Sequence, residues 1–322
     1  MKKKIKIICT LGPSSLNRKF LEYSKKNINI LRLNMSHLNL NEMQKNILFI
    51  RKYTNTQICI DSEGAQIRSK VKKKKFFKKN LKITVFQGKA NFLEFYPEYI
   101  FNKIKKGDLL NIGFDNLKIK ILKKNEKKFS AIVVREGLLE NNKGVHIENR
   151  KIDINYLTNK DFKAIQLAKQ MNIKTFALSF TNSEEDINSF NKLLKKNSNK
   201  IYKIETKKAV KNFETMIKAG SNFLIDRGDL SKDIDIINIP KVQRDLIEIK
   251  KKYKNKNIFI ATNLLESMIY NNYPTRGEAN DIYSSLEMGA DGLVLAAETA
   301  VGKYPIECVE FIKKLINSFK KK

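Results

Sequence analysis

The chain has 322 residues, which suffices for one to three domains with sizeable cores. Its apolar content of 42% is ordinary for a globular protein, whereas its formal net charge of +31 invites a nucleic-acid or anionic-membrane partner. Two histidines exclude a histidine-rich metal site, and no apolar run approaches the length of a membrane span.

The excess of lysine has two explanations. Only nine of the 64 basic residues are arginine, and tryptophan is absent, a bias that AT-rich coding would produce without any functional cause. The alternative is a surface that binds polyanions. Where lysine is the default cation, a retained arginine suggests a need for bidentate contact with phosphate or carboxylate. Arg32, Arg68, Arg227 and Arg276 each stand beside a strand end or a glycine motif, which favours an anionic ligand.

The cysteines have no metal-binding spacing, and Cys9 and Cys59 lie in apolar runs. With Cys308 they are predicted to be reduced core residues, which suits a cytoplasmic protein. The basic start is followed by an apolar run that breaks at residues 10–13, too early for a signal peptide.

The first part of the chain alternates strands with helices. Strands are predicted at 4–10, 29–34 and 57–60, and helices at 18–26 and 41–53. This order predicts a parallel sheet.

The pattern changes after residue 69. Residues 70–79 are almost all lysine, broken by Val71, Phe76 and Phe77, and are interpreted as a solvated linker or edge. Period-two alternation then predicts antiparallel strands at 81–86, 117–122 and 129–134. We therefore predict a small β domain inserted into the α/β domain.

The alternation of strands and helices returns after residue 150. The predicted strands are 175–180, 201–206, 223–229, 257–261 and 292–297, and the predicted helices are 159–171, 183–195, 208–219, 242–253, 276–288 and 305–319. About eight strands, each followed by a helix, predict an α/β fold of the TIM (β/α)8 barrel type. The predicted domains are a barrel at 1–69 and 151–322 and a small β-barrel-like lid domain at 70–150, inserted after the third strand.

Polar residues follow the predicted strands at their carboxyl ends, where active sites of this fold lie. They are Thr10, Asn34, Ser36, Asp61, Ser179, Lys203, Glu205, Asp229, Thr262 and Glu298. Carboxylates from two neighbouring strands can share one hard cation with a phosphate, so Glu205 and Asp229 are candidate Mg²⁺ ligands. Lys203 beside them can neutralise phosphate charge. A surface salt-bridge cluster is the alternative.

Short motifs recur through nearly the whole chain in a specific order. They include CTLGPSS (9–15), RLNMSH (32–37), DSEGAQIR (61–68), KGV (143–145), KIE (203–205), RGDL (227–230) and ETA (298–300). In this order and spacing the sequence resembles the pyruvate kinase family. The resemblance implies a TIM barrel with a mobile lid, which transfers the phosphoryl group of phosphoenolpyruvate to ADP and protonates the enolate to pyruvate. It also implies Mg²⁺ and, usually, K⁺.

The resemblance implies a role for each matching residue. Glu205 and Asp229 would bind Mg²⁺, Lys203 would stabilise the moving phosphoryl group, and Thr262 would take part in protonating the enolate. The remaining matches are Arg32 for the phosphoryl group and nucleotide; Arg227, Gly228, Asp229 and Thr262 for the substrate carboxylate; Asn34, Ser36, Asp61 and Ser62 for K⁺; and Asn34, His37, Arg68 and Lys143 for the nucleotide. Alternatively, Arg68 only braces a strand and His37 only begins a helix.

Several residues depart from the family pattern. Ser62 replaces threonine, and Asp226 replaces a small residue. Glu63 replaces a lysine, Ala65 replaces a proline, and Gln66 replaces a residue that is linked to K⁺ dependence in the family. The others are Leu38, Asn182 and the pair Ala296-Ala297. The resemblance ends with the barrel, without the usual C-terminal domain. K⁺ dependence, nucleotide affinity and regulation are therefore open.

Two alternatives to a pyruvate kinase remain. One is a divergent relative that acts on another phosphorylated or enolpyruvate-like acid. The other is an inactive barrel that binds RNA or another polyanion through its lysines, against which the intact Lys203, Glu205 and Asp229 argue. A membrane partner is not expected, and the oligomeric state is open, a homo-oligomer included.

Overall fold

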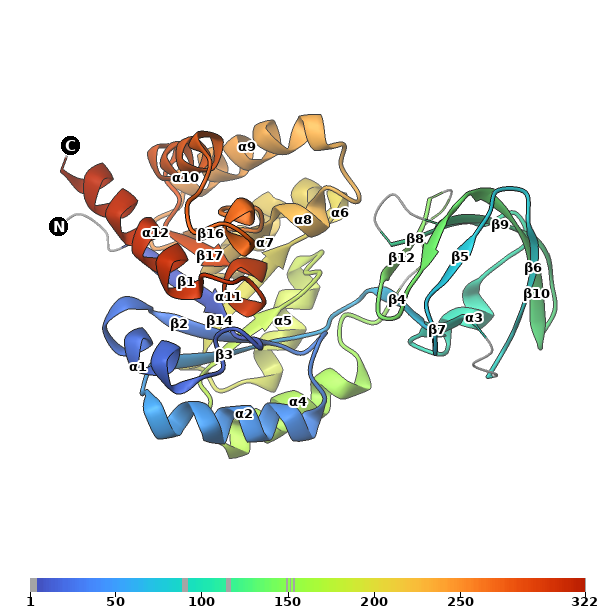
Figure 1. Cartoon of the computed structure of the whole chain (residues 1–322), viewed down its shortest axis with the longest axis horizontal. Coiled ribbons are helices and arrows are strands. Elements are labelled where there is room, and N and C mark those ends of the chain that lie inside the picture. Colours follow the sequence, from blue (N-terminus) through green and yellow to red (C-terminus); the bar gives the residue numbers. More distant parts are fainter. Residues whose placement is uncertain are drawn as a thin grey trace. The chain divides into compact units, whose positions relative to one another are not determined.

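The computed structural model describes residues 5–88, 92–113, 117–148, 150, 152 and 154–321. The chain divides into two compact units: unit 1 consists of Met1–Gly64 with Asn159–Lys322, and unit 2 consists of Ala65–Thr158. Figure 1 shows strands enclosed by helices in unit 1 and a curved antiparallel sheet in unit 2. In chain order, unit 2 follows the third strand of unit 1.

Unit 1 is built on a closed barrel whose paired strands are all parallel, in the order β1-β17-β16-β15-β14-β13-β3-β2. The strands are β1 (Lys6–Thr10), β2 (Ile30–Asn34), β3 (Gln57–Asp61), β13 (Thr175–Leu178), β14 (Asn199–Ile204), β15 (Asn222–Asp226), β16 (Asn257–Ala261) and β17 (Gly292–Leu295). The predicted TIM barrel is confirmed.

Helices cover the outside of this barrel (Figure 1). They are α1 (Arg18–Asn27), α2 (Leu40–Tyr53), α4 (Asn159–Gln170), α5 (Glu184–Leu193), α6 (Lys207–Lys211), α7 (Phe213–Ala219), α9 (Ile239–Lys251), α10 (Arg276–Met288) and α12 (Pro305–Lys320). Four shorter turns are α8 (Arg227–Leu230), α11 (Ala297–Ala300), η1 (Ile236–Asn238) and η2 (Glu266–Ile269). Helices α2, α5 and α10 begin with capping boxes. In each, the side chain of the residue just before the helix accepts from the backbone N–H of the third helical residue, whose side chain accepts from the backbone N–H of the capping residue.

One buried cluster takes at least one residue from every barrel strand. Its members are Ile8, Ile30, Cys59, Ala177, Ile201, Leu224, Phe259, Ala261 and Val294. Because side chains alternate between the two faces of a strand, these residues share the same face of the closed sheet. Burial of this face fixes the register of the strands, and with it the positions of the polar residues that follow their carboxyl ends.

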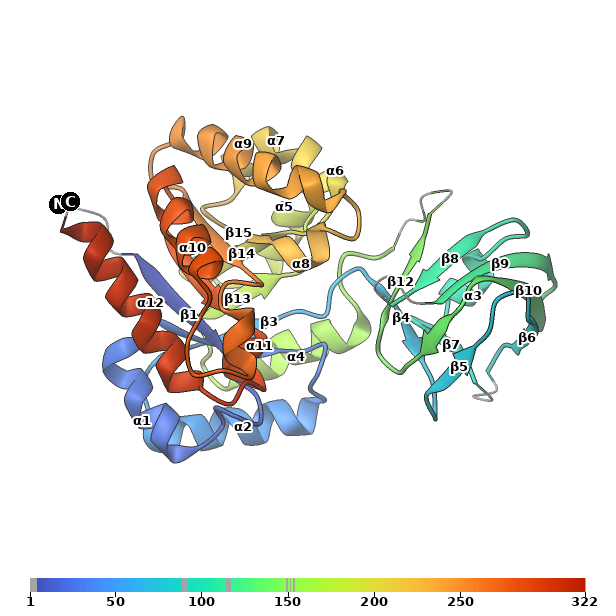
Figure 2. The ribbon, with the colours of Figure 1, turned by 45° about the horizontal axis from the view of Figure 1, so that its top comes forward.

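Unit 2 has its own core of buried apolar residues, separate from that of the barrel. Its strands are β4 (Ile67–Lys70), β5 (Lys75–Phe77), β6 (Lys82–Phe86), β7 (Glu94–Tyr96), β8 (Leu109–Ile112), β9 (Leu117–Lys124), β10 (Lys128–Arg135), β11 (Gly137–Leu139) and β12 (Gly144–Ile147). Seven form an antiparallel sheet in the order β6-β10-β9-β8-β12-β4-β7, and β5 pairs with β11. Helix α3 (Ile100–Lys103) lies beside the sheet in both views (Figures 1 and 2), and Phe101 packs on Phe129 at 5.7 Å between ring centroids.

The structure corrects two local predictions and adds to a third. The lysines of the stretch 70–79 are exposed, as predicted for a solvated linker or edge, but the stretch also contains a strand, β5, in which Phe77 is only 2% exposed. The strand predicted at 223–229 ends at Asp226, and Arg227–Leu230 form α8 instead. The helix predicted at 208–219 is divided at Asn212 into α6 and α7. Within the described residues, no helix has the length and apolar character needed to cross a membrane.

Candidate active site

Lys203 lies at the centre of a buried group of carboxylates. It belongs to β14, is 4% exposed, and has its Nζ 2.8 Å from Glu205 Oε1. The same Nζ lies 3.4 Å from Asp61 Oδ2 and 3.4 Å from Asp226 Oδ2. The side chains come from the ends of β14, its neighbour β15, and β3, which is separated from β14 by β13, so the shared carboxyl end of the parallel barrel brings them together.

Ser179 and Asp61 connect this group to the neighbouring strands. Ser179 Oγ lies 3.2 Å from Asp61 Oδ1 and accepts from Lys203 Nζ at 3.3 Å. Asp61 is fully buried and also faces Arg32, whose Nε lies 3.5 Å from Asp61 Oδ2. Ser179 had no assigned role from sequence, although its place after a predicted strand was the signal that could have identified it.

Arg32 has donor capacity left within the barrel. The residue is 6% exposed, and its Nε and Nη1 form no hydrogen bond with any residue that the structure describes. Buried polar groups are nearly always hydrogen-bonded, and an unmet donor costs free energy. A buried guanidinium with unmet donors is suited to binding an anionic ligand.

Glu205 and Lys203 both have shifted pKa values. Burial raises the pKa of Glu205; Lys203 opposes this effect, while Asp229 and Asp226 add to it, and the result is about 8. Burial lowers the pKa of Lys203, but Asp61, Glu205 and Asp226 outweigh burial, so that its pKa is raised above the ordinary value. Burial together with neighbouring carboxylates raises the pKa of Glu205, and neighbouring carboxylates raise the pKa of Lys203 against the effect of burial.

The carboxylates fit a divalent cation. One oxygen from each of Glu205, Asp226 and Asp229 lies within 4.8 Å of the others. Opposite oxygens across Mg²⁺ or Ca²⁺ are about 4.2 to 5.2 Å apart, since metal–oxygen distances are about 2.1 and 2.6 Å. Glu205 Oε2 accepts from Phe180 N at 2.5 Å, and Asp229 forms an ion pair with Lys232. Glu205 and Asp229, the predicted Mg²⁺ ligands, are therefore close enough to share one ion.

Thr262 is held in a strained conformation at the end of β16. Its φ is 70°, a region that β-branched residues rarely adopt and that often marks a functional site. Thr262 Oγ1 accepts from Gly228 N at 2.8 Å and donates to Asp226 Oδ1 at 3.2 Å. Arg227 braces this turn: Nη2 donates to Thr262 O at 2.7 Å and Nη1 to Asp281 Oδ2 at 2.7 Å. The Arg227 guanidinium thus positions Thr262.

The predicted K⁺ ligands lie at the ends of β2 and β3. Asn34 Oδ1 accepts from Ser36 N at 3.0 Å. Ser62 Oγ accepts from Ser179 N at 3.0 Å, and Ser62 O accepts from Ser179 Oγ at 2.7 Å. Asp61 contacts Arg32 and Lys203, as described above. The role of these four residues in binding K⁺ stays a prediction.

The predicted nucleotide-side residues are divided between the units. Arg32, Asn34 and the exposed His37 belong to unit 1, whereas Arg68 and Lys143 belong to unit 2. In unit 2, β4 pairs with β12, and Arg68 donates from Nη1 to Asn142 O at 3.3 Å. Lys143 Nζ lies 3.3 Å from Glu140 Oε2. The nucleotide role of these residues stays a prediction.

Two of the polar strand-end residues have structural hydrogen bonds. Thr10 Oγ1 donates to Leu295 O at 2.9 Å. Glu298, which is 2% exposed, accepts from Ala296 N at 2.7 Å and from Leu265 N at 3.2 Å. The first contact joins the ends of β1 and β17, and the other two tie Glu298 to the turns around Leu265 and Ala296.

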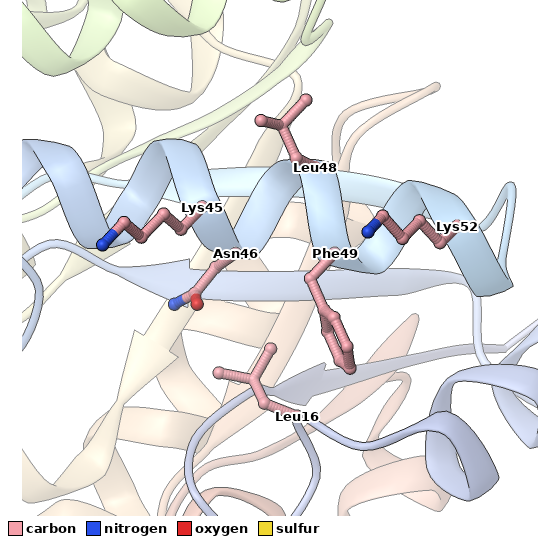
Figure 3. A pocket seen from close by; sticks show the side chains of 6 residues that line it. All are labelled: Leu16, Lys45, Asn46, Leu48, Phe49 and Lys52. Atoms are coloured by element: carbon pink, nitrogen blue, oxygen red, sulfur yellow. The ribbon is translucent and has the colours of Figure 1, made fainter.

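A separate hollow lies against α2 (Figure 3), where Phe49 points toward Leu16. Its other lining residues are Lys45, Asn46, Leu48 and Lys52. None of them belongs to the group around Lys203, so this hollow is not part of the candidate active site.

A buried lysine, an arginine with free donors and grouped carboxylates at the strand ends define a (β/α)8-barrel protein suited to binding a cation together with an anion. The family profile described as "Pyruvate kinase, barrel domain" matches residues 2–309. The chain therefore belongs to the pyruvate kinase family.

Known relatives agree with this membership. The chain is 31% identical to a pyruvate kinase of Thermotoga maritima, in a match that covers 98% of this chain and 71% of that protein. It is 32% identical to a pyruvate kinase of Methanocaldococcus jannaschii, over 98% of this chain and 69% of that protein. It is 30% identical to a pyruvate kinase of Staphylococcus saprophyticus, over 97% of this chain and 56% of that protein.

Proposed function

We propose that this protein transfers the phosphoryl group of phosphoenolpyruvate to ADP, giving ATP and pyruvate. Family membership supports the proposal, and one observation carries it: the buried Lys203 lies beside candidate cation ligands, while Arg32 in the same group keeps unmet donors. Phosphoryl transfer depends mainly on positioning and on neutralising the charge of the phosphoryl oxygens, and these side chains can supply both.

In the proposed reaction, the bond from phosphorus to the enol oxygen breaks and a bond to a terminal oxygen of ADP forms. Arg32 binds phosphoryl oxygens with its unused donors, and Lys203 neutralises charge on the moving group. Glu205 and Asp229 would hold Mg²⁺, which would supply charge to polarise the phosphoryl oxygens. The enolate left behind then takes a proton at its terminal carbon, with Thr262 at the end of β16 as the residue proposed to assist.

The proposal extends to the remaining ligands. The backbone of Arg227, Gly228 and Asp229 would hold the substrate carboxylate. The hydroxyl of Thr262 already contacts this turn through Gly228 N. We further propose that Asn34, Ser36, Asp61 and Ser62 bind K⁺. His37, Arg68 and Lys143 would contact the nucleotide.

The test is a lactate-dehydrogenase-coupled assay with phosphoenolpyruvate, ADP and Mg²⁺, run with K⁺ or with a tetraalkylammonium salt in its place. The proposal predicts pyruvate formation that needs both ADP and Mg²⁺. No turnover at any salt composition contradicts it, and affinity for RNA that survives physiological salt would then favour a polyanion-binding barrel. Equal rates with and without K⁺ would contradict only the K⁺ site.

A further inference from the structure

Asp226 is a buried carboxylate that the proposed reaction does not use. It ends β15 and is 4% exposed. Its Oδ2 lies 3.4 Å from Lys203 Nζ, and its Oδ1 accepts from Thr262 Oγ1 at 3.2 Å. The side chain therefore lies among the residues that handle the phosphoryl group. Burial of a carboxylate is unfavourable unless it gains partners, and Asp226 gains Lys203, Thr262 and the backbone N–H of Asp229.

The charges around Asp226 call for a further cation. Among the residues that the structure describes, ion pairs join Asp61, Glu205, Asp226 and Asp229 to Arg32, Lys203 and Lys232. The formal charges of these seven side chains, four carboxylates and three cations, sum to −1. A buried surplus of this kind is stabilised by a metal ion more readily than by solvent.

A second observation points to the same position. Glu205 Oε1 is fully buried and pairs with the Lys203 ammonium at 2.8 Å, and it accepts no further hydrogen bond from the residues that the structure describes. Oxygens of Glu205, Asp226 and Asp229 lie within 4.8 Å of one another. A buried carboxylate oxygen with a single partner, beside two further carboxylates, is suited to binding a hard cation that prefers oxygen ligands.

We propose that Asp226 is a third protein ligand of the divalent cation, so that the barrel binds this ion before any substrate arrives. The inference rests on the proposed function, because the cation is the one that serves phosphoryl transfer. Affinity for such ions rises with the number of charged ligands. Three carboxylates therefore hold the ion without help from substrate oxygens, whereas two would depend on them.

The test measures Mn²⁺ binding by the full chain without substrate, by electron paramagnetic resonance of free Mn²⁺ and by calorimetry. The intact protein should bind one ion, and Asp226→Asn should weaken binding about tenfold or more. Asparagine keeps an acceptor for Thr262 Oγ1 and for the backbone of α8, so the turn is preserved. Asp245→Asn, at an exposed ion pair on α9, removes one charge elsewhere and should leave the affinity unchanged.

Circular dichroism checks that each variant is folded, and Asp226→Ala serves as the second variant. Unchanged Mn²⁺ affinity in Asp226→Asn, with binding lost in Glu205→Gln, would overturn the role of Asp226. The role of Asp226 would also be overturned if the protein turned over phosphoenolpyruvate but bound no Mn²⁺ when substrate was left out. In that case the proposed function would stand. Mn²⁺ binding that depends on Asp226 in a protein without turnover would support the ligand role and contradict the proposed function.

Discussion

At the scale of single residues, the site depends most on Lys203. Its ammonium lies within 3.4 Å of Asp61, Glu205 and Asp226, in a place from which water is largely excluded. A charge in such a place interacts strongly with an anion, because little solvent is present to screen it.

Replacing Lys203 by methionine should therefore abolish most turnover. Loss of a positioned charge stabiliser lowers kcat by about 10²–10³. Steady-state kinetics measure the effect, and circular dichroism checks the fold. Lys200→Met, at the amino-terminal part of the same strand, is the matched control and should keep its activity. Activity of Lys203→Met within about tenfold of the parent would refute its assigned role.

A second prediction concerns Arg32. Arg32→Lys retains the charge but loses the planar guanidinium, with its unmet Nε and Nη1 donors, so kcat/KM for phosphoenolpyruvate should fall about 10- to 100-fold. Arg51→Lys, on the exposed side of α2, is the control and should behave as the parent. Full activity in Arg32→Lys would show that a single positive charge suffices there.

The sequence predicted some site residues better than others. Lys203, Glu205 and Asp61 follow apolar strands, and the structure brings them together because parallel strands end at one edge. The contacts of Asp226 with Lys203 and Thr262 were not predicted, since a carboxylate that departs from the family pattern gives no sign of its partners. The contacts of Ser179 with Asp61 and Lys203 likewise depend on side-chain directions that the sequence alone does not specify.

At the scale of elements, the barrel interior holds the strand ends in place. Phe259 on β16 is 1% exposed within the cluster drawn from all eight strands. Phe259→Ala should lower the free energy of unfolding by about 3–5 kcal/mol, because it removes buried contacts and leaves a cavity. Urea unfolding followed by circular dichroism measures this change.

The control for that prediction is Leu48→Ala on α2, where the leucine is 52% exposed. Its effect should stay within about 0.5 kcal/mol, as expected for a surface substitution. Equal destabilisation by both substitutions would contradict the account of the barrel interior.

Element ends were predictable where local chemistry specifies them. The helix predicted at 276–288 matches α10, which begins with a capping box of Thr275 and Glu278 and ends before Gly289 at a φ of 112°. The helix predicted from 242 begins earlier, at Ile239, with Pro240 in its first turn. The end of β15 was misplaced because Asp226 caps α8 through a contact that charge pattern alone does not reveal.

At the scale of the whole molecule, unit 2 has a core independent of the barrel. Its buried residues include Phe95, Phe101 and Phe129, whose rings lie within 6.1 Å of their neighbours. We predict that a fragment of residues 65–158 folds alone, since a continuous chain with its own apolar core satisfies the requirements of a domain. Cooperative urea unfolding with a β-type circular dichroism spectrum would agree, whereas gradual, non-cooperative unfolding would contradict the prediction.

As a whole molecule, the protein is proposed to transfer the phosphoryl group from phosphoenolpyruvate to ADP. Phosphorus-31 magnetic resonance follows this directly, without coupling enzymes, in a mixture of the protein, phosphoenolpyruvate, ADP and Mg²⁺. We expect the phosphoenolpyruvate signal to decline as the γ-phosphate signal of ATP grows in equal amount, and both changes to be about 10²–10³-fold slower with Lys203→Met. Release of inorganic phosphate in place of ATP, or unchanged spectra with the intact protein, would contradict it.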